Sequence, residues 1–473
     1  MYKLAKNVIL IIAAMAARDA FAYDYSARFN LGIYTIKEDL KNTGIAPTSN
    51  DRMLGIGRAY LDLTNLTSSG LTFTMDVRNQ YDPFGRIEPS LGRMAASNDA
   101  QLRQLVLRTP PTRQGFFWSV GRFVAADAVV LGNDGVEGGI RFNPNTRFGL
   151  FGGLYPEHRG GRSLKIAKEE RQVGTYAVFE ENSKAGENNT YASSSIVSRK
   201  SVDGVGSFDN PAVRRGGSIL VGNETAPPDD APVDNYVFWY ANAFRQRAGG
   251  QRISYISHII VQPTAQIRNL WASWYQPFAQ RLSGTVNVFH LDLRSYQQFR
   301  DLLDRLPISG YSQIGGDLRF KLSNQMALVG DTSYGRRDVD GRNQYGLGGR
   351  LVTTGLLRSH LTAFAGLGVR RNFLSQDVVL RSGATYYLQE SAFSASLQYT
   401  SQTLADRPAL HPLVADFDVS MLINRSLIGA FAFEVAQDEQ ASIYSALLSI
   451  GYRINNRQAT PIRDETPKLE RVL

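Results

Sequence analysis

The chain has 473 residues, a formal net charge of +9 and no cysteine. Its length allows two or three soluble domains or one large β-structure. The lack of cysteine excludes disulfides, thiolate metal sites, a cysteine nucleophile and a lipidated N-terminal cysteine. Lys and Arg are scattered and form no single patch with interleaved aromatics. We therefore expect no nucleic-acid partner, and a surface or interior that favours anions.

The first 22 residues have the pattern of a secretory signal peptide. Lys3 and Lys6 precede an apolar run at 8–17, and the small-residue motif "AFA" ends at Ala22. An N-terminal membrane anchor is the weaker alternative, because the run is far shorter than the roughly 20 residues of a spanning helix. We expect residues 1–22 to direct export through the inner membrane and to be removed.

From residue 25 onward, short segments repeat in which apolar and polar residues alternate. In 311–322, Ile314 and Leu318 fall on one parity. Asp317 and Arg319 fall on the other. A β-strand sends successive side chains to opposite faces, so each segment predicts a strand with one apolar and one polar face. The predicted strands are 25–35, 55–66, 71–81, 101–109, 116–123, 136–142, 147–154, 172–179, 190–200, 235–247, 251–261, 265–276, 282–293, 311–322, 325–336, 343–354, 357–371, 377–388, 392–402, 413–423, 427–436 and 441–454.

Short and long connections alternate between these segments. The short ones include "TSSG" at 67–70, "NPNT" at 143–146, "AGG" at 248–250, "LSNQ" at 322–325, "QES" at 389–391 and "NRS" at 424–426. The long ones are 36–54, 82–100, 155–171, 201–234 and 294–310. Transmembrane barrels of the bacterial outer membrane have this asymmetry, with tight periplasmic turns and long outer loops. A soluble β-sandwich has no reason to sort its loops by length.

These patterns predict an all-β protein, a large antiparallel up-and-down transmembrane β-barrel over residues 23–454. The pattern gives about 22 strands, with 20 or 18 as alternatives because strand boundaries are its least determined feature. Tyr and Phe near the strand ends are typical of the aromatic girdles at bilayer interfaces, although cross-strand packing in a soluble sheet would use them too. Because alternation starts at residue 25, we expect no plug domain before the barrel.

The segment 119–142, "SVGRFVAADAVVLGNDGVEGGIRF", has "GR" ending one strand and "DG" opening the next. It resembles the corresponding hairpin of phosphate-selective and related substrate-specific porins. The last strand, "SALLSIGYRI", resembles the β-signal that barrel-assembly machinery recognises. The resemblance implies a porin-like barrel in a Gram-negative outer membrane, surrounded by lipid and lipopolysaccharide and assembled by that machinery. Porins usually end at a terminal aromatic, whereas here 455–473 follow, a tail that we expect to be flexible, periplasmic and available to an envelope protein partner.

In such a barrel the polar faces line the lumen. The inward candidates are the cationic residues Arg58, Arg78, Arg141, Arg319, Lys321, Arg350, Arg358, Arg370 and Arg453, and the acidic residues Asp62, Asp76, Asp317 and Glu434. The cationic majority favours anionic solutes, since Arg binds phosphate and carboxylate groups well. Alternatively, these charges pair across neighbouring strands inside a wet lumen.

Two connections have unusual composition. Residues 125–134 are apolar for a loop, which makes them a candidate constriction loop folded into the lumen, with Asp127, Asn133 and Asp134 as its polar members. Residues 201–234 include "APPDDAP" and several glycines, as in a mobile outer loop or a lumen lid.

The sequence contains no set of residues typical of an enzyme. Its five histidines lie far apart with no two at metal-ligand spacing, so we expect no metal, cofactor or catalytic site. Two functions remain. One is a channel for passive diffusion of small solutes, biased toward anions. The other is a structural or secretion-associated barrel that binds envelope partners through its loops or its tail. The pattern does not define the solute, the oligomeric state or whether the lumen is open.

Overall fold

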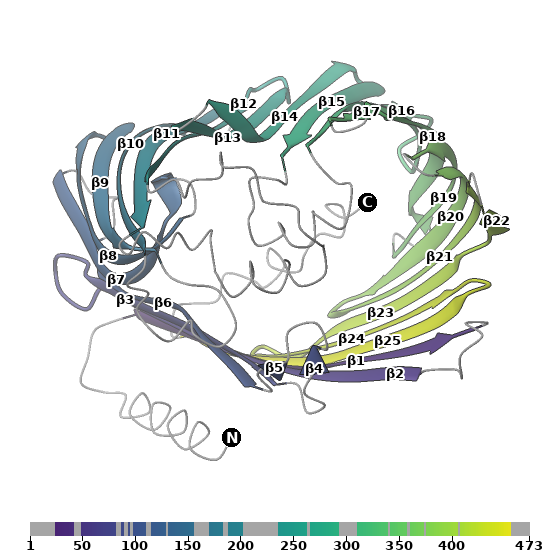
Figure 1. Ribbon diagram of the computed structural model, residues 1–473, viewed down its shortest axis with the longest axis horizontal. Helices are drawn as coiled ribbons and strands as arrows, with labels where there is room; N and C mark the ends of the chain where they lie inside the picture. Colours follow the sequence, from purple (N-terminus) through teal and green to yellow (C-terminus); the bar gives the residue numbers. More distant parts are fainter. Residues whose placement is uncertain are drawn as a thin grey trace, which may run out of the picture.

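The fold is one antiparallel β-sheet closed into a ring (Figure 1). The computed structural model describes residues 24–41, 49–81, 87–88, 93–94, 98–109, 115–128, 131–155, 170–182, 188–201, 235–262, 265–292, 310–338, 341–356, 360–372, 375–404 and 407–455. The predicted signal peptide and residues 456–473 of the predicted tail lie outside these ranges. Among the described residues, no helix is long and apolar enough to cross a membrane.

The strands of the wall follow one another in chain order around the ring. They are β1 (Asp24–Leu40), β2 (Ser49–Thr64), β3 (Thr72–Tyr81), β6 (Asn98–Arg108), β7 (Gly115–Ala125), β8 (Leu131–Asn143), β9 (Thr146–Leu154), β10 (Glu170–Asn182), β11 (Asn189–Ser201), β12 (Asn235–Gln246), β13 (Arg252–Gln262), β14 (Gln266–Ala279), β15 (Leu282–Leu291), β16 (Tyr311–Lys321), β17 (Met326–Arg337), β18 (Asn343–Gly355), β19 (Leu361–Arg371), β20 (Ser375–Leu388), β21 (Ser391–Leu404), β23 (Leu413–Asn424), β24 (Leu427–Gln437) and β25 (Ala441–Asn455).

Three short strands and one helical turn lie outside this ring. The strand β22 (Arg407–Leu410) extends the sheet beside β21, and β4 (Ile87–Glu88) pairs with β5 (Arg93–Met94). The 3-10 helix η1 (Ala126–Ala128) connects β7 to β8.

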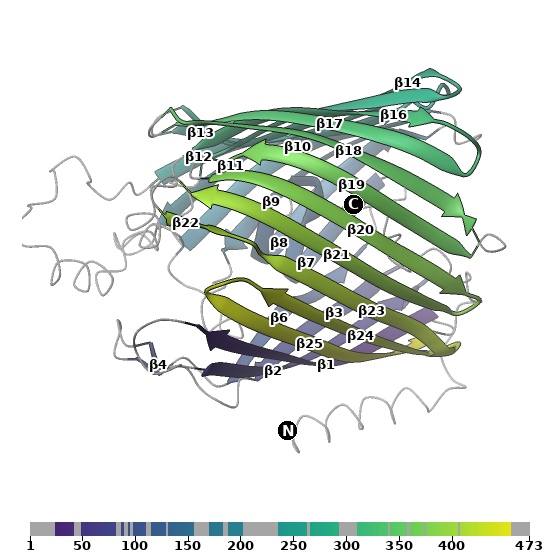
Figure 2. The same ribbon diagram turned by 90° about the vertical axis from the view of Figure 1, so that its right-hand side faces the viewer.

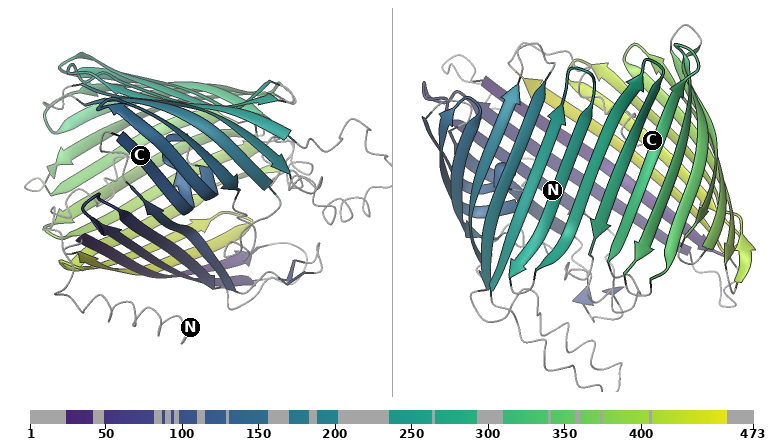
Figure 3. Two further views of the ribbon diagram at one scale, coloured as in Figure 1. Left: turned by 90° about the vertical axis from the view of Figure 1, so that its left-hand side faces the viewer. Right: turned by 90° about the horizontal axis from the view of Figure 1, so that it is seen from above.

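Closure is made by the first and last wall strands. β1 pairs with β2 along one edge and with β25 along the other, from Ser26 opposite Asn455 to Leu40 opposite Ala441. A closed ring leaves no free sheet edge, which is what a lipid environment requires. In the described residues the predicted antiparallel barrel of 22 strands is thus confirmed, with no plug helix in it. Figure 2 and Figure 3 show the strands crossing the wall obliquely, as barrel closure demands.

The outer face of the ring is apolar. Phe116, Leu31 and Leu347 are 71%, 70% and 69% exposed, and many more exposed apolar side chains lie on the other wall strands. In 311–322, Leu318 is 58% exposed and belongs to this outer set, whereas its neighbour Asp317 has the opposite parity. A soluble monomer rarely exposes an apolar surface of this extent. A closed β-barrel with an apolar outer face is the architecture that the alternating pattern predicts, so the prediction is confirmed for the fold.

The two rims differ in their connections. One, here called the turn rim, holds both described chain ends, Asp24 and Asn455, and turns as short as 144–145, 280–281 and 425–426. At the opposite rim, the loop rim, lie the strand ends that the long connections join, among them Ser201 and Asn235; residues 202–234 lie outside the described part of the chain. The predicted sorting by length is less strict than expected, because three residues suffice at the loop rim at 263–265 and 438–440.

One arc of the inner face is apolar and buried. Phe151 is 0% exposed and Val197 is 0% exposed, while the adjacent Leu150 and Ile196 face outward at 63% and 54%. The inner residues belong to a cluster that extends from β6 to β13 and includes Phe117, Tyr176 and Phe238. The prediction that polar faces alone line the lumen is therefore wrong for this arc. Ala125 and Ala128 from the β7–β8 hairpin join this cluster, which explains why apolar residues face inward here.

Candidate functional site

The β7–β8 hairpin leaves the wall before it ends. β7 pairs with β6 as far as Arg122, and β8 pairs with β9 only from Asp134 onward. The two strands of the hairpin nevertheless stay paired with each other up to Ala125 opposite Leu131. The hairpin tip 123–133, of which residues 123–128 and 131–133 are described, therefore stands off the sheet in its described part. Its η1 turn contacts β10 and β11, which places the tip across the inner face of the barrel (Figure 1).

Two glycines allow the hairpin to bend at this point. Gly121 has φ +119°, a conformation that side-chain-bearing residues rarely adopt, and a Cβ there would collide with the Leu105 carbonyl oxygen. A Cβ at Gly135 would collide with the Gly152 carbonyl oxygen. These glycines belong to the "GR" and "DG" motifs, and the motifs lie opposite each other across the hairpin. Both strands run through the motifs instead of ending there.

A buried ion pair closes the base of the tip. Arg122 Nε donates to Asp134 Oδ1 at 2.6 Å, and Nη2 donates to Oδ2 at 2.6 Å. Both side chains are only 7% exposed. Arg122 Nη1 also donates to the Leu102 carbonyl oxygen at 2.8 Å, which ties the pair to β6. Bidentate pairing with further hydrogen bonds is the arrangement that makes a buried ion pair tolerable.

The far end of the tip is held against the inner wall. Arg147 of β9 donates to Asp127 through Nε at 2.7 Å and Nη2 at 2.8 Å. The Tyr191 hydroxyl donates to the same carboxylate at 3.3 Å, and Ser195 Oγ donates to the Ala128 carbonyl oxygen at 2.7 Å. Side chains of β9 and β11 thus hold the far end of the tip.

A side-chain amide holds the return strand of the tip. Gln172 of β10 donates to the Gly132 carbonyl oxygen at 2.6 Å and to Asn133 Oδ1 at 3.1 Å. Asn133 is 0% exposed and donates to the Gly152 carbonyl oxygen at 3.3 Å. Of the three predicted constriction residues, Asp127 lies in η1, whereas Asn133 and Asp134 belong to β8 and not to a loop. The structure brings all three into one inward-folded hairpin.

The wall beneath the tip carries its own ionic network. Glu180 accepts hydrogen bonds from Arg141 and from Arg147, the latter at 2.8 Å. Glu137 accepts hydrogen bonds from Ser119 at 2.8 Å and from Tyr176 at 2.6 Å. Arg141, a predicted lumen cation, is only 7% exposed and already bound to Glu180, so it is part of the wall and does not face an open lumen.

Several of these functional side chains were not predicted. Arg147, Glu137 and Glu180 lie on the inward-facing parity of strands that the alternation identified, whereas Arg122 shares the parity of the exposed Phe116 and Val120. Their pairing depends on which strands the inward tip crosses, and alternation contains no signal for that. The "GR" and "DG" pairs were the only sequence signal at the bend.

Predicted lumen residues on β2 and β3 pair with one another. Arg58 donates to Asp76 through Nε at 2.8 Å and Nη2 at 2.7 Å. Thr74 Oγ1 donates to Asp62 at 2.8 Å, and Arg78 lies directly opposite Arg58 in the strand register. On this part of the wall, Arg58 is paired with a carboxylate on the neighbouring strand, whereas Arg78 donates to Gln80 at 3.4 Å.

A different arrangement holds on β16 to β18. Arg319 and Arg350 flank Val329 in register, and Lys321 follows two residues after Arg319 on the same face. Among the described residues, these three cations, here called the cationic group, form no ion pair with a carboxylate. Asp317 accepts a hydrogen bond from a threonine of β15 at 3.3 Å.

The remaining predicted residues lie further around the ring. Arg370 donates to Asp377, which is 1% exposed, at 2.9 Å. Glu434 lies directly opposite Asp416 on β23 and forms an acidic strip with it and Asp418. Arg453 lies at the end of β25, and Arg358 is outside the described residues. The inner wall therefore carries an acidic strip and a cationic group on different arcs.

Among the described side chains, no group of three or more His, Asp or Glu residues could hold a metal ion. No protein-family model matches the chain, and no curated protein matches it either.

Solved structures give matches over nearly the whole length. The P pilus usher (PapC) translocation pore has a TM-score of 0.45 and 9% identity, covering 92% of this chain and 100% of that one. OccK9 (OpdG) of Pseudomonas aeruginosa has a TM-score of 0.43 and 10% identity, covering 91% and 98%. OpdK of Pseudomonas aeruginosa, solved with vanillate, has a TM-score of 0.43 and 8% identity, covering 91% and 99%.

Proposed function

We propose that the protein is a porin-like channel of the bacterial outer membrane, through which small hydrophilic solutes diffuse. The observation that carries the proposal is the tip 123–133, which leaves the wall and is fastened across the inner face of a closed ring. Wall side chains alone fill barrels of about eight strands, whereas rings of 16 or more strands enclose a lumen. An inward-folded hairpin narrows such a lumen without blocking the whole ring.

The wall charges support a modest preference for anions. The cationic group of Arg319, Lys321 and Arg350 has no ion-paired carboxylate among the described residues and can therefore attract solute anions. On β2 and β3 the opposite holds, since Arg58 is neutralised by Asp76. The acidic strip at Asp416 opposes the bias on another arc, so we expect a weak preference and not strict selectivity.

Planar-bilayer recording tests the channel and its bias separately. The purified protein should give stepwise single-channel conductance, and a salt gradient should give a reversal potential displaced toward the anion equilibrium value. The double variant Arg319→Gln/Arg350→Gln should bring that potential closer to zero. Arg319→Lys/Arg350→Lys is the matched control because it keeps both charges, and it should behave like the wild type.

Each outcome has a distinct meaning. An absence of conductance would reject the channel. The structural or secretion-associated barrel would then remain, although none of the described residues specifically supports it. Conductance with a reversal potential that neither double variant changes would reject the role of the cationic group and keep the channel. Recovery of the heat-modifiable protein in outer-membrane fractions tests the proposed location.

A further inference from the structure

Two cations lie directly opposite each other on the outer face of the barrel, at the loop rim. Arg171, near the start of β10, is the register partner of Lys200, near the end of β11. Both residues are exposed. None of the described residues forms an ion pair with either side chain. This pair, here called the outer cationic pair, is separate from the inward-folded tip and from the cationic group.

Parity places the outer cationic pair on the apolar side of the wall. Val173 shares the parity of Arg171 and is 58% exposed, and Ile196 shares the parity of Lys200 and is 54% exposed. Arg199, the neighbour of Lys200, has the opposite parity and is 8% exposed. Successive side chains of a strand point to opposite faces, so the pair borders the lipid-facing surface and does not line the lumen.

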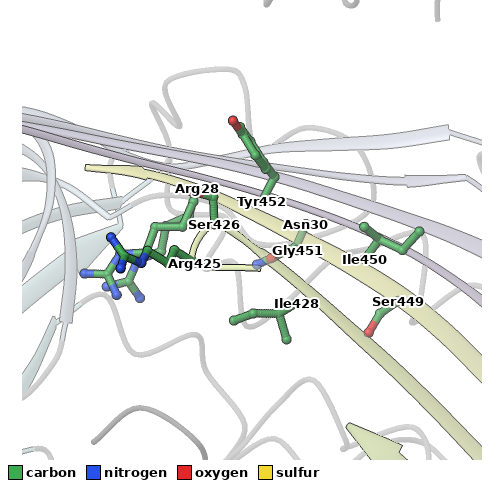
Figure 4. A pocket seen from close by; sticks show the side chains of 10 residues that line it. Arg28, Asn30, Arg425, Ser426, Ile428, Ser449, Ile450, Gly451 and Tyr452 are labelled. Atoms are coloured by element: carbon green, nitrogen blue, oxygen red, sulfur yellow. The ribbon is translucent and has the colours of Figure 1, made fainter. Parts of the chain in front are cut away.

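Arginines at the β1–β25 seam have the opposite placement. Figure 4 shows Arg28 and Arg425 directed to one side of a pocket there, with Tyr452 pointing away from them. Phe29, the neighbour of Arg28, is the register partner of Tyr452, which is 45% exposed on the outer face. Arg28 therefore faces the lumen, where a headgroup of the surrounding bilayer does not reach it. The outer cationic pair is accessible from the bilayer.

The pair lies at the height where lipid headgroups meet the barrel. β10 begins at Glu170 and β11 ends at Ser201, so each cation is one residue from the end of its strand at the loop rim. The apolar surface begins two residues further into the wall on β10, at Val173. Lys and Arg at such a border can lay their apolar stems on the hydrocarbon surface and keep the charged group at the headgroups.

The neighbouring strands supply no charge that neutralises the pair in this row of the sheet. Leu154 of β9 lies opposite Arg171, and Asn235 of β12 lies opposite Lys200. Like charges directly opposite each other in a sheet are destabilising, so an anion bound between them is favourable. A phosphate group suits both cations, because a guanidinium binds its oxygens in bidentate fashion and an ammonium binds them as a point charge.

We propose that the outer cationic pair binds the phosphate of an anionic lipid headgroup in the leaflet at the loop rim. The acyl chains of that lipid then run along Val173 and Ile196, toward Trp239, the register partner of Ile196 on β12. The inference goes beyond solute passage. It depends on the outer face lying in a bilayer and not on conduction through the lumen.

Quenching of tryptophan fluorescence by brominated lipids tests the site. The full-length protein is reconstituted into phosphatidylcholine vesicles that contain increasing fractions of phosphatidic acid with brominated acyl chains. This lipid should quench Trp239 saturably, at a several-fold lower mole fraction than brominated phosphatidylcholine does. The double variant Arg171→Gln/Lys200→Gln should lose the difference between the two lipids. Trp239→Phe should lose it too, which identifies the reporter.

Arg336→Gln/Arg371→Gln is the matched control. Both arginines are exposed at the loop rim and share the outward parity of Tyr334 and Tyr345, which are 49% and 50% exposed. None of the described residues forms an ion pair with them. They are not opposite each other, because Tyr345 is the partner of Arg371 and Asn343 is the partner of Arg336. This variant removes the same charge from the same face and should keep the preference for phosphatidic acid.

Three results would overturn the proposal. The first is equal quenching of the wild type by both brominated lipids. The second is an equal loss of preference in both double variants, which would indicate only a general attraction of anionic lipid. The third is loss of the preference in inorganic phosphate but not in sodium chloride at equal ionic strength, which would make free phosphate the ligand.

Heat-modifiable gel migration confirms that each variant is folded. If Arg171→Gln/Lys200→Gln fails to fold, Lys200→Gln alone should raise the mole fraction of phosphatidic acid at half-maximal quenching several-fold, and an unchanged value would contradict the site. The conductance of the same variants is read separately, so a failed channel assay does not decide this proposal.

Discussion

Arg122 and Asp134 face each other across the β7–β8 hairpin and form a buried bidentate ion pair, with both nitrogen–oxygen distances at 2.6 Å. The pair lies where both strands leave the wall, beside the glycines that permit the bend. It therefore joins the part of the hairpin that belongs to the sheet to the part that lies inside the ring.

Arg122→Gln should destabilise the base of the tip. Removing one partner of a buried ion pair leaves the other charge uncompensated, at a cost of about 3–5 kcal/mol. We expect a lower thermal midpoint and a higher mean single-channel conductance with larger current noise, because the tip is less firmly held. Planar-bilayer recording and heat-modifiable gel migration measure the two effects.

Arg58→Gln is a matched comparison for that variant. It also breaks an Arg–Asp pair on the inner wall, but one whose arginine side chain is 42% exposed and which lies away from the hairpin. It should lower stability less and leave current noise unchanged. Equal noise in both variants would show that the hairpin tip does not control the lumen.

Asp127→Asn should loosen the far end of the tip without removing its base. Arg147 keeps Glu180 as a partner at 2.8 Å, so the loss in stability should be smaller than for Arg122→Gln. A double-mutant cycle with Arg147→Gln should give a coupling energy in the range of about 0.5–3 kcal/mol, measured by urea unfolding in micelles. Strictly additive effects would contradict the contact.

Gly135→Ala should disturb the bend. Its new Cβ would meet the Gly152 backbone, which cannot move aside as a flexible side chain can. We expect a loss of about 1–3 kcal/mol, typical of overpacking, and a reduced yield of folded barrel. Gly349→Ala is the control, because a Cβ there has no atom within 4 Å and should be tolerated.

Leu318→Arg and Asp317→Arg should differ sharply although the residues are adjacent. Leu318 lies on the apolar outer face, where an arginine near the bilayer midplane costs about 2–4 kcal/mol. Asp317 has the opposite parity and should accept arginine with a change in reversal potential and little change in stability. Folding into lipid vesicles, followed by gel migration, compares the two. A similar loss of folded protein in both variants would contradict the assignment of Leu318 to the outer face and Asp317 to the inner face.

Alternation predicted the barrel well because it depends only on local sequence. Every predicted segment has its strand, and the pattern in 311–322 assigns Leu318 and Asp317 to the faces on which they lie. The sorting of connections by length was less regular than expected, since three residues suffice at the loop rim at 438–440, between β24 and β25.

The hairpin tip was predictable only in part. The apolar composition of 125–134 indicated an inward fold, but the continuation of β7 and β8 through the "GR" and "DG" motifs was missed. The pattern predicts Arg141 as a lumen cation, because parity identifies a face and not its surroundings. Arg141 is buried because it pairs with Glu180, which lies on another strand. The alternation within one segment does not show which strands lie close to it.

The pairing of β1 with β25 places a constraint on how the chain folds. Thr35 and Ala446 contact each other across the seam although 411 residues separate them in the chain. Contacts of such long range form slowly, because the loop between them must close before any pairing energy is gained. The hairpins within the wall can form from neighbouring segments, whereas the seam requires both ends of the barrel. We therefore expect ring closure to be the late, rate-limiting event of assembly, and an incompletely closed sheet to be the species most prone to misassociation.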